Sequence, residues 1–323
     1  MKSLTESKKK MTMERFLDKY ALVAVFVVMV TVFSILSPSF LSFSNAVNVL
    51  LTAAPIGIAT VGQAIVLMQG GEDISAGSAM YFAPVVCSFA MNKGMNVFVF
   101  VLIALAAGGI VGAINGTLVT KFKVVPLIAT YGTLMLFRGA GLLLADQQTI
   151  IVSDEAVNGI ATAALFGIPV LVLVFVFIMV LAWFVLGYTP FGRQLYAIGN
   201  DQRSAEKIGI NVNARRMIAY VICGALSGMA GLISCSQSSA ITTSLGNGKA
   251  FTFIAAAVLG GVSLAGGKCR VFPHLIVGIL IITAVETGLI MMNANPYLYQ
   301  VVRGGLIALA VIIDSIHSRA ELR

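Results

Sequence analysis

Residues Ile168–Leu186 read IPVLVLVFVFIMVLAWFVL, an apolar run without a single charged side chain. This run lies inside the uncharged tract Ala156–Gly192, and two further uncharged tracts cover Tyr20–Gly71 and Met217–Gly248. Because roughly 20 apolar residues are enough for a helix to cross a bilayer, each tract can hold at least one membrane span. The sequence therefore predicts a polytopic membrane protein.

The composition of the whole chain agrees with this class. Of 323 residues, 59% are hydrophobic and only 11% are charged, and the mean hydropathy is +0.97, whereas a soluble domain carries about a quarter charged residues. We predict an all-α, polytopic transmembrane bundle of about ten helical spans. The expected spans cover residues 20–37, 46–68, 75–91, 97–120, 124–145, 168–186, 217–234, 251–264, 271–292 and 297–313.

The distribution of charge predicts an orientation. With the N-terminus inside, the expected inner loops carry most cations and the outer loops keep only Lys93 and Lys249, which is the pattern of the positive-inside rule. We expect a cytoplasmic basic tail at 1–19, a membrane domain at 20–313 and a cytoplasmic tail at 314–323. This rule explains the net charge of +8 without a nucleic-acid partner. The inner cations are Lys121, Lys123, Arg193, Arg203, Lys207, Arg215, Arg216, Lys268, Arg270, Arg319 and Arg323.

Two features of the span pattern stay open. Ten spans divide into two sets of five with opposite orientations, as in the inverted repeats of transporters. The similarity between the halves is faint, so coincidence among glycine-rich spans explains it equally well. The third and eighth spans are short, and either full or re-entrant segments fit them.

The longest polar interruption is Gly192–Arg216, which reads GRQLYAIGNDQRSAEKIGINVNARR. Asn200 or Asp201 suits the N-cap of a short helix, and Gly209 suits the position after its end. The orientation places this cationic segment in the cytoplasm, where it is expected to form a docking surface. An ordinary solvated loop is the alternative.

Catalytic and metal chemistry have little support in the sequence. Neither of the two histidines, His274 and His317, has a partner that suggests a metal site or a catalytic triad. The four cysteines show no metal-binding spacing. Gly260–Lys268 fails the phosphate-loop pattern, because Val262 and Cys269 replace the required glycine and hydroxyl residue. We expect no enzyme activity, no metal and no cofactor held by this chain.

Polar residues within the expected spans are candidates for a translocation path. Arg138, Glu286 and Arg303 each lie about six or seven residues inside the outer end of a span, roughly 10 Å deep. Ionisable groups at that depth are costly unless they are paired or face a watery cavity. One hypothesis pairs Glu286 with Arg303 and places Arg138 on the same path; a purely structural or snorkelling pair is the alternative.

Two further candidates for this path are Asp73 and Asn115. Asp73 or Ser75 is suited to cap the third span, and capping alone would explain the residue. Small and polar residues at Asn115-Gly116 allow close helix packing, which would explain that motif equally well.

Seven short blocks occur in order along the chain: GEDISAGS at 71–78, NGTLV at 115–119, VPLIATYGT at 125–133, Arg138-Gly139, residues 192–210, IAAAVLGG at 254–261 and SLAGG at 263–267. Taken together, these blocks resemble the permease subunits of bacterial ATP-binding-cassette importers for ribose, xylose, galactose and related sugars, a family that includes autoinducer-2 permeases. The block at 71–78 resembles the family pattern G-x-D-L-S-V-G-S, and the polar interruption resembles G-R-x-x-Y-A-I-G-G-N-x-x-A-A-x-x-S-G-I. The likeness covers nearly the whole chain.

The resemblance implies a division of labour among subunits. Two permease subunits, either identical or related, would form the pathway in the bacterial inner membrane, in contact with lipid. A cytosolic ATPase would bind ATP and dock on a coupling helix, and an extracytoplasmic binding protein would deliver the solute. The expected coupling helix covers Asn200 to Ile210. Its coupling residues would be Asn200, Asp201, Arg203, Ser204, Ala205, Glu206, Lys207, Gly209 and Ile210.

The chain also departs from the family pattern. Glu72 replaces an apolar residue, Lys268–Arg270 replaces a glycine-containing turn, Lys249–Phe253 lacks an acidic residue, and Glu286 stands where asparagine is common. These differences leave the particular sugar open. A stand-alone secondary transporter using Glu286, Arg303 and Arg138 is the alternative function, and a structural membrane subunit is a third.

Overall fold

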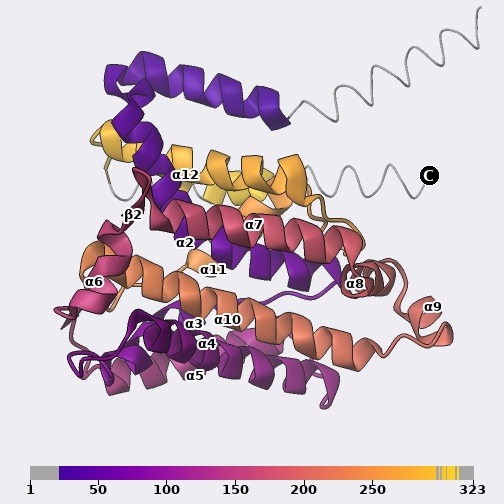
Figure 1. Ribbon diagram of the computed structural model, residues 1–323. Coiled ribbons are helices and arrows are strands. Elements are labelled where there is room, and N and C mark those ends of the chain that lie inside the picture. Colours follow the sequence, from indigo (N-terminus) through magenta and orange to yellow (C-terminus); the bar gives the residue numbers. More distant parts are fainter. Residues whose placement is uncertain (1–21, 296–297, 299, 303, 310, 313–323) are drawn as a thin grey trace, which may run out of the picture.

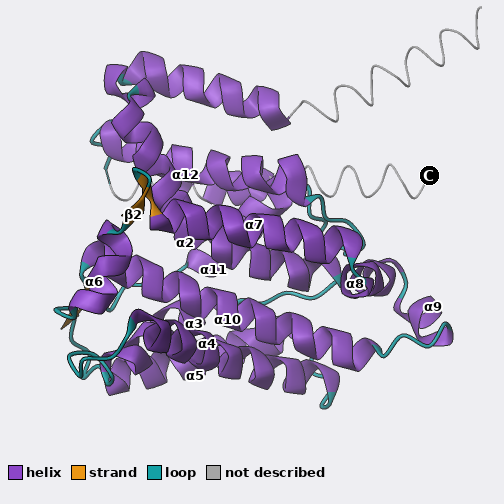
Figure 2. Ribbon diagram, in the orientation of Figure 1, coloured by secondary structure: helices purple, strands orange, loops and turns teal. Residues whose placement is uncertain are grey.

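The computed structural model describes residues 22–295, 298, 300–302, 304–309 and 311–312. Within that part, nearly all regular structure is helical (Figures 1 and 2), so the prediction of a polytopic helical membrane protein is confirmed. The expected tails at 1–19 and 314–323, His317 and Arg303 lie outside the described residues.

Six helices are long and apolar enough to cross a membrane among the residues that the structure describes. The expected bounds are close to the observed ones because long apolar runs end at glycine, proline and charged residues. These helices are α2 (Phe43–Met68), α4 (Val97–Thr120), α5 (Pro126–Leu144), α7 (Val170–Tyr188), α10 (Val212–Ser238) and the segment Val271–Met291, which joins η2 (Val271–Leu275) to α12 (Ile276–Met291).

Four shorter apolar helices correspond to the other expected spans: Leu22–Leu36, α3 (Ala76–Ser88), α11 (Lys249–Leu259) and Gln300–Leu309. At about 1.5 Å per residue, α3 and α11 are roughly 20 Å and 17 Å long, well short of a 30 Å hydrocarbon core. The expected eighth span, 251–264, is too long at its C-terminal side, because the helix ends at Leu259 and Gly260 is its C-cap. Non-helical chain follows as far as Arg270.

Helix α2 lies at the centre of the bundle. Every residue from Ala53 to Gln69 is buried, and the helix packs against α7, α10, α11 and α12. A helix that is apolar on all faces has no solvent or lipid side and is stable only when neighbours surround it. The core therefore lies around α2, whose neighbouring helices can be followed in Figure 1.

Helices α4 and α10 approach each other at backbone distance. A Cβ atom on Gly108 would collide with the carbonyl oxygen of Gly224, and a Cβ atom on Gly224 would collide with that of Gly108. Only residues without a side chain allow such contact, which is the usual packing of small residues between membrane helices. The pair is closely packed, and α10 also contacts α2.

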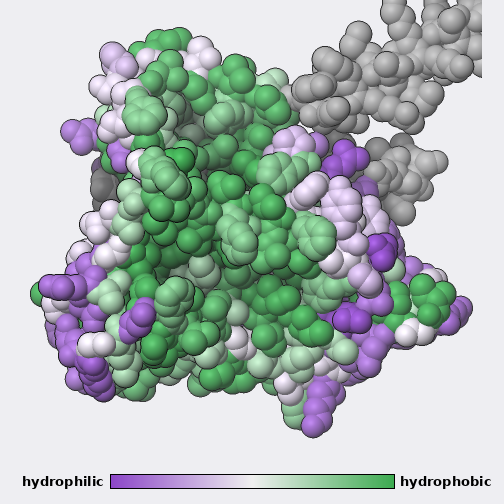
Figure 3. Space-filling view, in the orientation of Figure 1, coloured by the Kyte–Doolittle hydropathy of each residue, from purple (hydrophilic) through white to green (hydrophobic). Residues whose placement is uncertain are grey.

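The ends of the bundle differ in structure. One end carries α8 (Pro190–Asn200) and α9 (Gln202–Lys207), and we call it the α9 end (right in Figure 1). The opposite end, which we call the α6 end, carries the short helix α6 (Glu155–Thr162) within the expected acidic loop. In the space-filling view, a broad hydrophobic belt separates hydrophilic residues at these two ends (Figure 3).

Four two-residue strands lie outside the all-α expectation. β1 (Ile150–Ile151) pairs antiparallel with β4 (Ala240–Ile241), and β2 (Ala164–Leu165) pairs with β3 (Ile168–Pro169) in a hairpin. The first pair joins the chain after α5 to the chain after α10. The connection stabilises the loops at the α6 end.

Candidate functional site

The polar interruption forms two helices. The predicted single helix over Asn200–Ile210 is wrong in its bounds, because Asn200 is the last residue of α8 and a separate helix, α9, covers Gln202–Lys207. Pro190 stands at the start of α8, where its fixed φ and missing N–H are tolerated. Leu195 and Ile198 are the buried apolar side of α8.

Asp201 is the N-cap of α9, and it is one of the two residues that the sequence predicts for this position. Its Oδ1 accepts the backbone N–H groups of Arg203 (2.9 Å) and Ser204 (3.3 Å), and its Oδ2 accepts the Ser204 hydroxyl at 2.6 Å. The hydrogen bonds from Ser204 favour the charged carboxylate and lower the pKa of Asp201. The start of α9 is therefore well defined although it is exposed.

The end of α9 has the Schellman arrangement. The N–H of Gly209 donates to the Glu206 carbonyl (3.0 Å), and the N–H of Ile210 donates to the Ala205 carbonyl (3.1 Å). Gly209 has a φ of 84°, in the left-handed region that glycine adopts without strain. The predicted position of Gly209 just after the helix is confirmed.

Helix α9 is anchored on one side and free on the other. Ala205 is 2% exposed and packs with Ile198 of α8 and Val212 of α10. Arg203, Glu206 and Lys207 are exposed, and Ile208 is 74% exposed. An exposed isoleucine among charged side chains on a short, packed helix is a surface suited to a protein partner.

A buried polar cluster lies where the chain leads into α3. Asp73 Oδ1 accepts the backbone N–H and the hydroxyl of Ser75 at 2.9 Å and 2.6 Å, and it lies 3.3 Å from the Asn115 amide nitrogen. That amide also donates to Ser75 Oγ at 2.6 Å, and Thr133 donates to Asn115 Oδ1 at 2.5 Å. Asp73 and Asn115, predicted from separate motifs, are in contact.

Gln63 of α2 completes this cluster. In the amide orientation that satisfies both of its polar atoms, Gln63 donates to the Asp73 carbonyl at 3.1 Å and accepts the Asp73 N–H at 3.3 Å. Gln63 and Asp73 are both fully buried. Sequence reasoning missed Gln63 and Thr133, since single polar residues in apolar helices have no distinguishing pattern.

Arg138 holds the chain that precedes α11. Its guanidinium donates to the carbonyl oxygens of Thr243 and Leu245, the latter at 2.6 Å, and lies 4.4 Å from the centre of the Tyr81 ring. These contacts offset the cost of placing the charged guanidinium of Arg138 within the bundle.

Glu286 pairs with Lys249, the first residue of α11. The Lys249 Nζ atom is 3.2 Å from Glu286 Oε1 and 3.3 Å from Oε2. The sequence predicts an outer loop at Lys249, but the residue belongs to a helix and to an ion pair. Arg303, the predicted partner of Glu286, lies outside the described residues.

The N-terminal ends of the two short helices meet. A Cβ atom on Gly77, in the first turn of α3, would lie 2.5 Å from the carbonyl oxygen of Gly246, shortly before α11. We call this contact, together with the Asp73 cluster, Arg138 and the Lys249–Glu286 pair, the half-helix junction. Helix N-termini carry partial positive charge, so the junction combines oriented backbone dipoles with polar side chains inside the bundle. The role of these residues in transport stays a prediction.

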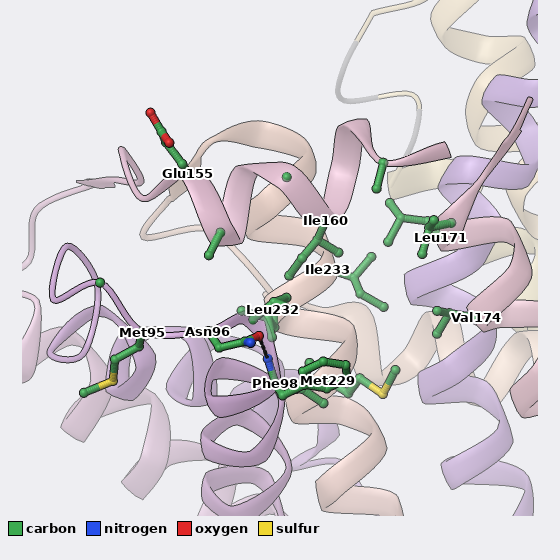
Figure 4. Close-up of a pocket in the computed structure, with 17 residues that line it drawn as sticks. Met95, Asn96, Phe98, Glu155, Ile160, Leu171, Val174, Met229, Leu232 and Ile233 are labelled. Carbon is green, nitrogen blue, oxygen red and sulfur yellow. Dashed lines mark hydrogen bonds between the residues drawn. The ribbon is translucent and has the colours of Figure 1, made fainter. Parts of the chain in front are cut away.

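A separate cavity of about 730 Å³ lies toward the α6 end, between α4, α6, α7 and α10 (Figure 4). Its lining is mostly apolar: Phe98, Ile160, Leu171, Met229 and Ile233 all contribute. Asn96 uses its side-chain oxygen to cap α4, accepting from Phe98 N at 3.1 Å, and the Glu155 carboxylate points away from the cavity (Figure 4). These walls suit hydrocarbon better than a sugar.

Metal-ligand side chains do not gather in the part of the chain that the structure describes, where no three His, Cys, Asp or Glu residues form a group. His274 lies in η2, next to the chain that follows α11.

Comparison with known proteins gives consistent matches. A family model described as branched-chain amino acid transport system / permease component matches residues 45–311. The ribose import permease of Escherichia coli K12 is 32% identical over 93% of this chain and 94% of its own length. The D-allose transport system permease of the same organism is 32% identical over 99% of this chain and 98% of its own. A probable ABC transporter permease from that strain is 31% identical over 94% and 92%. No solved structure matches the chain.

Proposed function

The chain belongs to the family of transport-system permease components described above, and from this membership we propose that it is the membrane-spanning subunit of an ATP-binding-cassette importer for a monosaccharide. The observation that carries the proposal is the similarity to ribose and allose permeases over nearly the full length of both chains. The family description mentions branched-chain amino acids, but the substrate class proposed here follows these relatives.

The proposed arrangement uses both ends of the bundle. The four shorter apolar helices enter the membrane with the six long ones, giving about ten spans in two halves, with both termini in the cytoplasm. The cations of the α9 end then face the cytosol, and residues 192–216 form the coupling region for a cytosolic ATPase. An extracytoplasmic binding protein docks at the α6 end, and a second permease subunit, identical or related, completes the pathway.

The half-helix junction is the proposed polar part of the pathway. Asp73, Asn115, Arg138 and Glu286 surround the point where α3 and α11 meet, and discontinuous helices whose N-termini face the middle of the membrane commonly contact solutes in transporters. ATP hydrolysis takes place on the partner subunit, so this chain contributes the path and its movement.

Uptake into proteoliposomes tests the proposal. The chain would be reconstituted with its cognate ATPase and binding protein, with ATP on the ATPase side and a panel of labelled ribose, allose and arabinose outside. We expect accumulation of at least one sugar that needs ATP and disappears when the ATPase is omitted. Accumulation driven by a proton gradient without the ATPase would overturn the proposal in favour of a secondary transporter.

A further inference from the structure

The last turn of α8 touches two chain segments at backbone distance. A Cβ atom on Gly199 would collide with the carbonyl oxygen of Met68 and the amide nitrogen of Gly267. These two atoms are also joined to each other, because Gly267 N–H donates to the Met68 carbonyl at 2.9 Å. Gly199, the end of α2 and the loop at Gly267 therefore meet without side chains between them.

Each of the two segments leads to a short helix. Residues 69–75 run from the end of α2 to α3, and residues 260–270 follow α11. The N-terminal ends of α3 and α11 meet each other at Gly77 and Gly246. The contacts thus form a closed ring: Gly199, the segment to α3, the half-helix junction, α11, and the segment back to Gly199.

A buried side-chain amide lies next to this contact, on the residue that follows Met68. Gln69, directly after α2, is 1% exposed, and neither its Nε2 nor its Oε1 has a hydrogen-bond partner among the described residues. Buried polar groups are almost always paired, so an unpaired amide requires a reason. One such reason is a segment that exchanges between two conformations, because the Gln69 amide can then form its hydrogen bonds in the second conformation.

We propose that Gly199 is a positioning residue for transport, through which movement of α8 and α9 displaces the segments leading to α3 and α11 and so opens or closes the half-helix junction. The inference rests on the proposed function, since the ATPase supplies the movement. Helix α8 would act on the segments leading to the short helices through the backbone contacts of Gly199.

Gly199→Ala tests this role because the added methyl group must push Met68 or Gly267 away. The control is Gly187→Ala in α7, where an added Cβ meets nothing within 4 Å. Both variants would be purified with the ATPase, and uptake and ATP hydrolysis would be measured on the same proteoliposomes. We expect Gly199→Ala to transport about tenfold less sugar per ATP hydrolysed by the docked ATPase. Gly187→Ala should match the wild type.

A second variant covers the case in which Gly199→Ala does not assemble. Asn200 is exposed, and its Oδ1 lies 2.5 Å from the position that a Cβ atom on Gly267 would take. Asn200→Ala removes this side chain beside Gly267 without adding volume, and we expect a smaller loss of sugar transported per ATP. An unchanged ratio in both variants, or a loss of ATPase binding that accounts for the loss of transport, would overturn the inference. Failure of the proposed function is different, since wild-type protein would then show no ATP-dependent uptake.

Discussion

Lys249, the first residue of α11, and Glu286, in α12, form an ion pair with Nζ 3.2 Å from Oε1 and side-chain exposures of 25% and 19%. The pair joins the start of a short helix to the long helix behind it. Because it lies within the apolar part of the chain, removing one partner exposes the other to a poorly solvating environment.

Lys249→Met is therefore expected to lower both stability and transport. We expect the free energy of unfolding to fall by about 1–2 kcal/mol, since the pair is partly exposed. Lys249→Arg keeps the charge and serves as the control. The charge exchange Lys249→Glu with Glu286→Lys should recover part of the loss, measured by thermal unfolding in detergent and by uptake. Equal stability of Lys249→Met and the wild type would show that the pair is not structural.

Asp73 is expected to matter as a hydrogen-bond acceptor. Asp73→Ala leaves the Ser75 N–H, the Ser75 hydroxyl and the Asn115 amide without the oxygen they share, and we expect a loss of about 2–3 kcal/mol in unfolding free energy. Asp73→Asn retains an acceptor oxygen at the same place and should cost about 1 kcal/mol or less. If the two variants are equally unstable, the charge of Asp73, and not its acceptor role, sustains the cluster.

The start of α9 provides a matched pair of variants at one position. Asp201→Ala removes the cap, and we expect the affinity for the ATPase to fall by about fivefold because the short helix frays. Asp201→Asn keeps a capping oxygen and should bind nearly as well. Because the pKa of Asp201 is lowered in the folded protein, the contribution of its charge is present at neutral pH and is lost as the pH falls through that lowered value. If Asp201→Ala and Asp201→Asn bind the ATPase with equal affinity, docking does not depend on a well-ordered α9.

Much of this architecture is predictable because lipid imposes a simple rule on sequence. The expected span 97–120 coincides with α4, and the expected 46–68 lies within α2, since long apolar runs must be helical to satisfy their backbone in a bilayer. The cap at Asp201 and the turn at Gly209 were also predictable, because each depends only on residues within a few positions.

Contacts between distant segments were not predictable in the same way. Lys249 and Glu286 are 37 residues apart, and nothing in the apolar pattern of α12 indicates which cation faces it. Helix α8 was missed because a polar stretch next to a membrane span reads as a loop, although Leu195 and Ile198 bury one of its sides. The backbone contact of Gly199 with Gly267 depends on the fold of three separate segments.

Binding of the ATPase to the α8–α9 surface tests the central claim most directly. Ala205 is buried between Ile198 and Val212, so Ala205→Arg must displace α9 while the membrane helices stay as they are. Ala163→Arg, an exposed position at the α6 end, is the control for the added charge. The dissociation constant for the ATPase would be measured with each variant in nanodiscs. We expect Ala205→Arg to insert normally but bind at least about tenfold more weakly than the wild type and Ala163→Arg. Wild-type affinity of Ala205→Arg, together with normal ATP-driven uptake, would contradict the account.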